Sequence, residues 1–121
     1  MPWGYRPANL MLRFALEIAG LVGLGVWGWN TQAGTGRWLL MILAPVLAAA
    51  AWGVFRVPDD PGPAPVRVPG WLRLALEAAF FAAAVCGWAE AGHPVAAGVL
   101  GAFVVLHYAT STDRIARVLR A

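Results

Sequence analysis

Residues 12–30 read LRFALEIAGLVGLGVWGWN, an apolar stretch with one Arg and one Glu near its start. An α-helix rises 1.5 Å per residue, so about 20 residues cross the roughly 30 Å hydrocarbon core of a bilayer. Together with three further apolar runs, this stretch predicts helices at about 10–29, 38–57, 71–89 and 95–110. Only helices and closed barrels satisfy their backbone groups within lipid. The predicted fold class is therefore an all-α, integral membrane four-helix bundle.

The composition supports a membrane protein. The chain has 121 residues, of which 60% are hydrophobic and 12% are charged, about half the charged share of an ordinary soluble domain. Too few polar side chains are present to cover a water-soluble surface of this size. All nine basic residues are arginines, and they lie beside the apolar runs. This placement indicates membrane topology, with the lipid bilayer as partner and no nucleic acid.

The connecting segments predict a single domain, residues 1–121, built from two helical hairpins. Short polar turns at 30–37 and 91–94 close the hairpins, and segment 58–69, with five prolines, separates them as an extended loop. Eight of the nine arginines fall on the side of this loop, which the positive-inside rule makes cytoplasmic. We therefore expect a multi-pass protein of the bacterial cytoplasmic (inner) membrane with both termini inside. The basic tail, 113–121, is expected to lie on the lipid surface.

An internal repeat accompanies this topology. Residues 72–90 read LRLALEAAFFAAAVCGWAE, so Arg73 and Glu77 align with Arg13 and Glu17 at an offset of sixty. The first and third helices point the same way, which predicts a pseudo-two-fold axis along the membrane normal. The second and fourth helices show no comparable match. The repeat is therefore partial.

These charges form the candidate site. Arg13 with Glu17, and Arg73 with Glu77, are four residues apart and share a helical face. A charge inside the hydrocarbon costs about 2.5 kcal/mol or more, and Glu is too short to reach the interface, so each Glu needs a partner or a proton. The two pairs can form a structural four-member network, line a cytoplasmic cavity for an ion, proton or polar head group, or dock a partner helix. His107, near the same edge, is a further candidate, although a satisfied histidine is the simpler interpretation.

No pattern in the chain indicates catalysis. There is no nucleophile–base pair, phosphate loop or metal-ligand cluster. The single cysteine, Cys86, lies in the third apolar run and cannot form an internal disulfide. We expect a protein that is not an enzyme and has no metal site, and the sequence points to no particular cofactor.

Two helices carry small residues at four-residue spacing. On the first helix these are Ala15, Ala19 and Gly23, and on the fourth they are Gly98 with Ala102 or Ala97 with Gly101. Such faces allow helix backbones to approach closely, within the bundle or between protomers.

Pro45 is expected to kink the second helix and free a backbone carbonyl near Met41 or Ile42. The fourth apolar run is short by itself, but its helix can continue into the polar residues 111–113, and the sequence leaves open whether it extends into the basic tail.

Several of these features together resemble a known family, the YrdB-like small bacterial membrane proteins (DUF2568), which have about four predicted membrane helices. The residues that carry the resemblance are Leu12-Arg13-Phe14 with Glu17, Trp27-Gly28-Trp29, Pro45, Trp52-Gly53-Val54-Phe55 with Pro58, and Arg73 with Glu77. The resemblance extends from about Asn9 to the start of the fourth helix. It implies the same topology, places Pro45, Trp52, Gly53, Phe55 and Pro58 in the family pattern, and implies no activity.

Two functions of different classes remain open. The first is a non-enzymatic structural, accessory or lipid- or small-ligand-binding component of a membrane assembly, with a homo-oligomer or a larger membrane complex as possible partners. The second is a small oligomeric transporter or channel in which the Arg/Glu pairs bind an ion, a proton or a polar head group.

Overall fold

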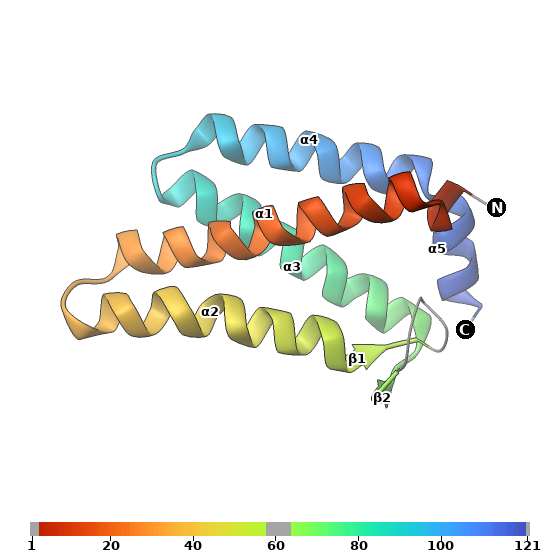
Figure 1. The fold of residues 1–121 in the computed structure, drawn as a ribbon, viewed down its shortest axis with the longest axis horizontal. Helices are drawn as coiled ribbons and strands as arrows, with labels where there is room; N and C mark the ends of the chain where they lie inside the picture. The colour runs from red at the N-terminus through yellow and green to blue at the C-terminus, as the bar shows by residue number, and fades with distance from the viewer. Residues whose placement is uncertain (1–2, 58–63, 121) are drawn as a thin grey trace.

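The computed structural model describes residues 3–57 and 64–120 (Figure 1). Its elements are η1 (Trp3–Tyr5), α1 (Pro7–Thr31), α2 (Thr35–Val54), β1 (Phe55–Arg56), β2 (Val66–Arg67), α3 (Gly70–Glu90), α4 (Pro94–Thr110) and α5 (Thr112–Leu119). The all-α prediction is confirmed. Half of the predicted proline-rich loop 58–69, namely residues 58–63 with Pro58, lies outside the described residues.

The long helices have the dimensions of membrane spans. By length and composition α1, α2 and α3 can each cross a bilayer, and α4 with α5 counts as a fourth span that is bent by 70°. These helices fit a membrane location. η1, the β1–β2 pair and α5 all lie at one end of the bundle, which we call the charged end for the arginines described below (Figure 1).

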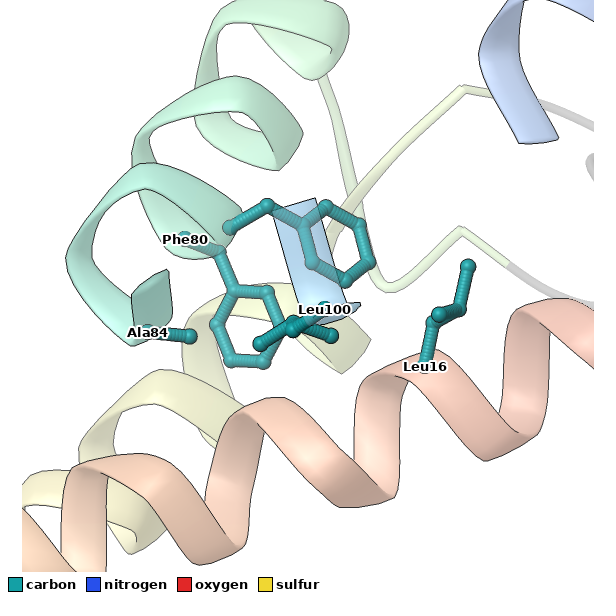
Figure 2. Close-up of a cluster of buried hydrophobic side chains, with 5 residues drawn as sticks. Leu16, Phe80, Ala84 and Leu100 are labelled. Carbon is teal, nitrogen blue, oxygen red and sulfur yellow. The ribbon is translucent and has the colours of Figure 1, made fainter. Parts of the chain in front are cut away.

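The helices do not pack symmetrically. α1 lies at the centre and packs against α2, α3 and α4, while α3 and α4 pack against each other. The buried apolar cluster joins α1, α3 and α4 (Figure 2), and its members are Leu16, Phe80, Phe81, Ala84 and Leu100. By contrast, α2 packs mainly against α1 and has no buried residue. In this position α2 presents most of its surface to the surroundings of the bundle.

Close approach between helices depends on glycines of α1. A Cβ atom at Gly28 would lie 2.6–2.8 Å from backbone atoms of Leu40 and Met41 in α2, and one at Gly23 would meet the Trp88 indole of α3. The predicted small-residue contact of helix 1 is thus present at Gly23. On α4, Gly98 faces open space and Ala102 is exposed, so these two residues make no such contact within the chain.

One predicted helix boundary is wrong. The second helix ends at Val54 instead of residue 57, because the next two residues form β1, which pairs in parallel with β2. The fourth helix ends at Thr110 as predicted, and the chain then turns at Ser111 into a separate helix, α5. Ser111 is itself buried and hydrogen-bonded to α1, which holds the turn in place.

Pro45 leaves one backbone carbonyl of α2 without its helical hydrogen bond, and this carbonyl lies where α2 packs against α1. α2 is helical on both sides of Pro45. Proline has no N–H to donate to the carbonyl four residues earlier. That carbonyl belongs to Met41, and a Cβ atom at Gly25 of α1 would lie 3.3 Å from its oxygen. The absence of a side chain at Gly25 therefore leaves room beside α1 for the Met41 carbonyl oxygen.

The basic tail forms α5 at the charged end. This helix folds across the end of the bundle and buries Arg114 and Val118, and its predicted place on the lipid surface stays a prediction. The helix packs against α3 so closely that a Cβ atom at Gly70 would collide with the carbonyl of Val118. The inner face of this amphipathic helix is covered by protein.

Substituting Gly28→Ala tests the close contact between α1 and α2. The added methyl group would collide with the Leu40 backbone, and overpacking of this kind costs about 1–3 kcal/mol. We expect a lower Tm in detergent, measured by circular dichroism. Gly98→Ala is the matched control, because its Cβ meets nothing within 4 Å, and its Tm should be unchanged or slightly higher. Equal Tm values for the two variants would contradict the packing described here.

Candidate functional site

The carboxylate of Glu77 is the centre of a buried charged cluster. Glu77 lies in the second turn of α3, and its side chain is 1% exposed. Arg73, one turn earlier, donates from Nε to Glu77 Oε2 at 2.8 Å. From α5, Arg114 donates to both carboxylate oxygens, at 3.0 Å and 2.8 Å. From α4, the Tyr108 hydroxyl donates to Oε1 at 2.5 Å. Three helices therefore meet at one carboxylate.

The second predicted pair joins this cluster from α1. Arg13 Nε lies 3.3 Å from Glu17 Oε1, and Arg13 Nη2 lies 3.6 Å from Glu77 Oε2. The Arg13 side chain is 7% exposed and that of Glu17 is 22% exposed. The two Arg/Glu pairs are thus brought together as one network. They are not equivalent, because Glu77 is fully enclosed and Glu17 lies at the margin.

Arg73 also ties α2 to the cluster. Its Nη1 donates to the carbonyl oxygens of Trp52, at 2.5 Å, and Phe55, at 2.8 Å. Carbonyls at a helix C-terminus have no intrahelical partner, so a guanidinium satisfies groups that would otherwise be orphaned. The guanidinium carbons of Arg13 and Arg73 lie 5.4 Å and 4.6 Å from the centre of the Trp52 ring, within the range of cation–π attraction.

The other residues of the resemblance have separate positions. Gly53 is exposed and a Cβ atom there would meet nothing within 4 Å, so the structure gives no packing reason for a glycine. Pro45 lies in the α1–α2 contact, away from the charged residues. Pro58 is outside the described residues.

His107 lies at the same end of the bundle in a second polar contact. It is fully buried, and its Nδ1 lies 3.0 Å from Asn9 Oδ1, while Asn9 Nδ2 donates to Ser111 Oγ at 3.0 Å. Because the Asn9 oxygen accepts, this arrangement assigns the imidazole proton to Nδ1. The contact joins α1 to the end of α4, as expected for a structural histidine. Nε2 has no hydrogen-bond partner among the residues that the structure describes.

Arg114, Tyr108 and Asn9 were missed in the sequence. The arginine belongs to a basic amphipathic segment, and such a segment has the same pattern whether it covers lipid or protein. One signal was available: Arg114 and Val118 are four residues apart, so the apolar face of the tail includes an arginine. A charge on an apolar face requires a buried acceptor, and Glu77 was a predicted residue in need of a partner.

The cluster has the chemistry of a structural ion-pair network. Within residues 3–57 and 64–120, no three His, Cys, Asp or Glu side chains are placed to hold a metal ion. Three guanidinium groups surround two carboxylates, and the atoms that meet at Glu77 are buried. A buried carboxylate is tolerated when hydrogen bonds and ion pairs replace its lost hydration. Here Arg73, Arg114 and Tyr108 donate hydrogen bonds to Glu77, and Arg13 forms an ion pair with it.

A separate feature lies on the outside of the α3–α4 hairpin. An open groove of about 560 Å³ runs between the two helices and reaches α5. Its lining is apolar except for the hydroxyl of Tyr108 and the thiol of Cys86. The lining residues are Leu74, Ala78, Phe81, Ala82, Val85, Cys86, Gly101, Val104, Val105, Tyr108 and Ile115. Tyr108 therefore contributes to the wall of the groove and also binds Glu77.

The similarity of the chain to known proteins shows its family. A family model described as "Protein of unknown function (DUF2568)" matches residues 11–105, well over half of the chain. The chain belongs to the DUF2568 family. It is also 37% identical, over 110 residues, to the uncharacterized protein YrdB of Bacillus subtilis (strain 168), an alignment that covers 88% of this chain and 89% of that protein. No solved structure matches the chain.

The resemblance seen in the sequence is thus confirmed. The family match includes both predicted Arg/Glu pairs and Trp52, and it ends before His107 and Arg114. The cluster therefore combines residues inside the matched region with residues beyond it.

Substituting Glu77→Gln tests whether the cluster holds the fold together. Removing the charge leaves three buried guanidinium groups without their shared carboxylate, and breaking a buried pair costs about 3–5 kcal/mol. Glu17→Gln is the matched control, because Glu17 is partly exposed and contacts one arginine; its cost should be about 1 kcal/mol or less. Both are measured as the free energy of unfolding in mixed micelles. A larger loss for Glu17→Gln would contradict the central place of Glu77.

Substituting Arg114→Gln tests the docking of α5. Loss of the bidentate contact to Glu77 should release the helix, seen as faster amide hydrogen exchange across 112–119 with little change in α1 and α3. Arg120→Gln, at an exposed position past the helix, should leave exchange unchanged. Slow exchange of α5 in the Arg114 variant would show that apolar packing alone holds it.

Proposed function

We propose that this protein is a non-enzymatic component of the bacterial cytoplasmic membrane that binds the hydrocarbon chain of a lipid in the groove between α3 and α4. The groove itself carries the proposal: it is open, almost wholly apolar and about 560 Å³ in volume. Small-molecule sites commonly measure about 300–1,000 Å³ and have mainly apolar linings.

The physical basis for chain binding is packing. Lipid tails are as apolar as leucine, so a chain gains little hydrophobic free energy by leaving the bilayer for a groove. It gains dispersion contacts instead, and these require walls of fixed shape. Here the wall is held from behind, because Phe81 belongs to the buried core and Tyr108 is hydrogen-bonded to Glu77. The charged cluster thus supports a non-enzymatic role by making the groove rigid.

The alternative, a small oligomeric transporter, finds less support. A coupling carboxylate has to reach water and exchange its partners, whereas Glu77 is enclosed by Arg13, Arg73, Arg114 and Tyr108. Glu17 is more accessible, but it is held by Arg13 at the margin of the cluster. These contacts favour a fixed network over an ion path.

The proposal also states which end of the bundle faces the cytoplasm and which helix surface is available to partners. The positive-inside rule places the charged end in the cytoplasm, with both termini inside. The unburied face of α2 is available to lipid, to a second copy or to a larger membrane complex. Small accessory proteins of this kind bind through such surfaces and need no catalytic group.

Filling the groove provides the test. Ala78 is exposed and lines the groove, so Ala78→Phe should fill part of it and lower the number of palmitoyl-oleoyl phosphatidylcholine molecules retained per chain in native mass spectrometry. The matched control, Ala50→Phe, adds the same ring to the exposed face of α2 and should retain lipid like the wild type.

The native cysteine gives a second readout. Because Cys86 lines the groove, bound phosphatidylcholine should slow its reaction with N-ethylmaleimide in the wild type and in Ala50→Phe. Equal retention by all three proteins, with no protection of Cys86, would overturn the proposed function.

A further inference from the structure

We propose that the lipid bound in the α3–α4 groove is an anionic phospholipid, whose head group is held by Arg67 and Arg120 at the charged end. This inference rests on the proposed function and adds the chemical class of the ligand. The groove and the two arginines are linked by the way in which α3 and α5 meet.

The groove ends where α5 joins α3. Its lining includes Leu74, in the second turn of α3, and Ile115 of α5. One turn farther out on the same faces lie Trp71, which is 65% exposed, and Leu119, which is 55% exposed. The two helices touch at this point, because a Cβ atom at Gly70 would lie 3.0 Å from Leu119 Cα. An apolar path therefore runs from the groove to the junction of α3 and α5.

Two exposed arginines flank this junction. Arg67 ends β2, three residues before α3 begins, and Arg120 directly follows Leu119. Neither arginine forms an ion pair with the part of the chain that the structure describes. The remaining arginines of α5 have internal roles, since Arg114 binds Glu77 and Arg117 donates to the Tyr5 hydroxyl. The acidic residue of this helix, Asp113, lies at its other end.

The chemistry of this junction fits a phosphate-bearing head group with net negative charge. Guanidinium groups donate in a planar fork that matches phosphate oxygens, and the charge attracts anionic lipid over a zwitterionic one, in which an ammonium group offsets the phosphate. Trp71 has the exposed position of an aromatic residue at the membrane interface. A hydrocarbon chain in the groove would thus bring its head group to the α3–α5 junction, next to which Arg67 and Arg120 lie along the chain without an ion pair to the described residues.

The experiment is a competition between two head groups with identical chains. The wild type in detergent is mixed with equal amounts of palmitoyl-oleoyl phosphatidylglycerol and phosphatidylcholine, and the retained lipids are counted by native mass spectrometry. Each arginine near an anionic surface contributes about a fivefold preference. We expect the wild type to retain more phosphatidylglycerol than phosphatidylcholine. This preference should be smaller in Arg67→Gln and in Arg120→Gln, and it should almost disappear in the double variant. Retention of phosphatidylcholine alone should stay unchanged throughout.

One control variant and the wild-type result separate the possible outcomes. Arg6→Gln removes an exposed arginine that precedes α1 at the charged end, and it should keep the preference. An equal loss in Arg6→Gln would overturn the inference in favour of a diffuse basic surface. Equal retention of both lipids by the wild type would overturn it while leaving the groove as a chain site. Retention of neither lipid would overturn the proposed function, and this inference with it.

Discussion

The structure depends on satisfying one carboxylate, that of Glu77, in a place without water. Its three hydrogen-bond donors come from α3, α4 and α5, Arg13 of α1 adds an ion pair, and Arg73 extends the contact to the Trp52 carbonyl of α2. Every long helix is therefore connected to the same group. In a medium of low dielectric constant, an ionised carboxylate is tolerated only with this degree of compensation. The apolar cluster of α1, α3 and α4 is less specific, since many arrangements of Leu and Phe side chains bury similar areas.

The sequence was sufficient for the helices and for half of the cluster. Apolar length determines a membrane helix almost without reference to the rest of the chain, and charges within such a run must find one another, so the meeting of Arg13 with Glu77 followed. The contribution of Arg114 did not follow, because it depends on a turn at Ser111 and on the close approach at Gly70. Such tertiary contacts produce no periodic pattern in the sequence from which they could be predicted. The end of α2 was misplaced for a similar reason, since β1 needs a partner strand ten residues away.

Tyr108 links the buried cluster to the outer groove. Its hydroxyl faces Glu77 and its ring borders the space between α3 and α4. The charged cluster and the apolar groove are thus separated by one aromatic side chain. Such a division of roles explains how a chain of 121 residues can combine charges inside its bundle with a shaped apolar surface outside.

The position of Arg114 in the chain has a consequence for biosynthesis. The ribosome makes α1 to α4 before it makes α5, so the nascent protein contains Glu77 before its bidentate partner exists. Arg73, one turn away on the same helix, is available to the carboxylate from the start, whereas Arg114 arrives last. The charged cluster can therefore close only after α5 has been made, and a chain that stops before α5 contains Glu77 without its bidentate partner, Arg114.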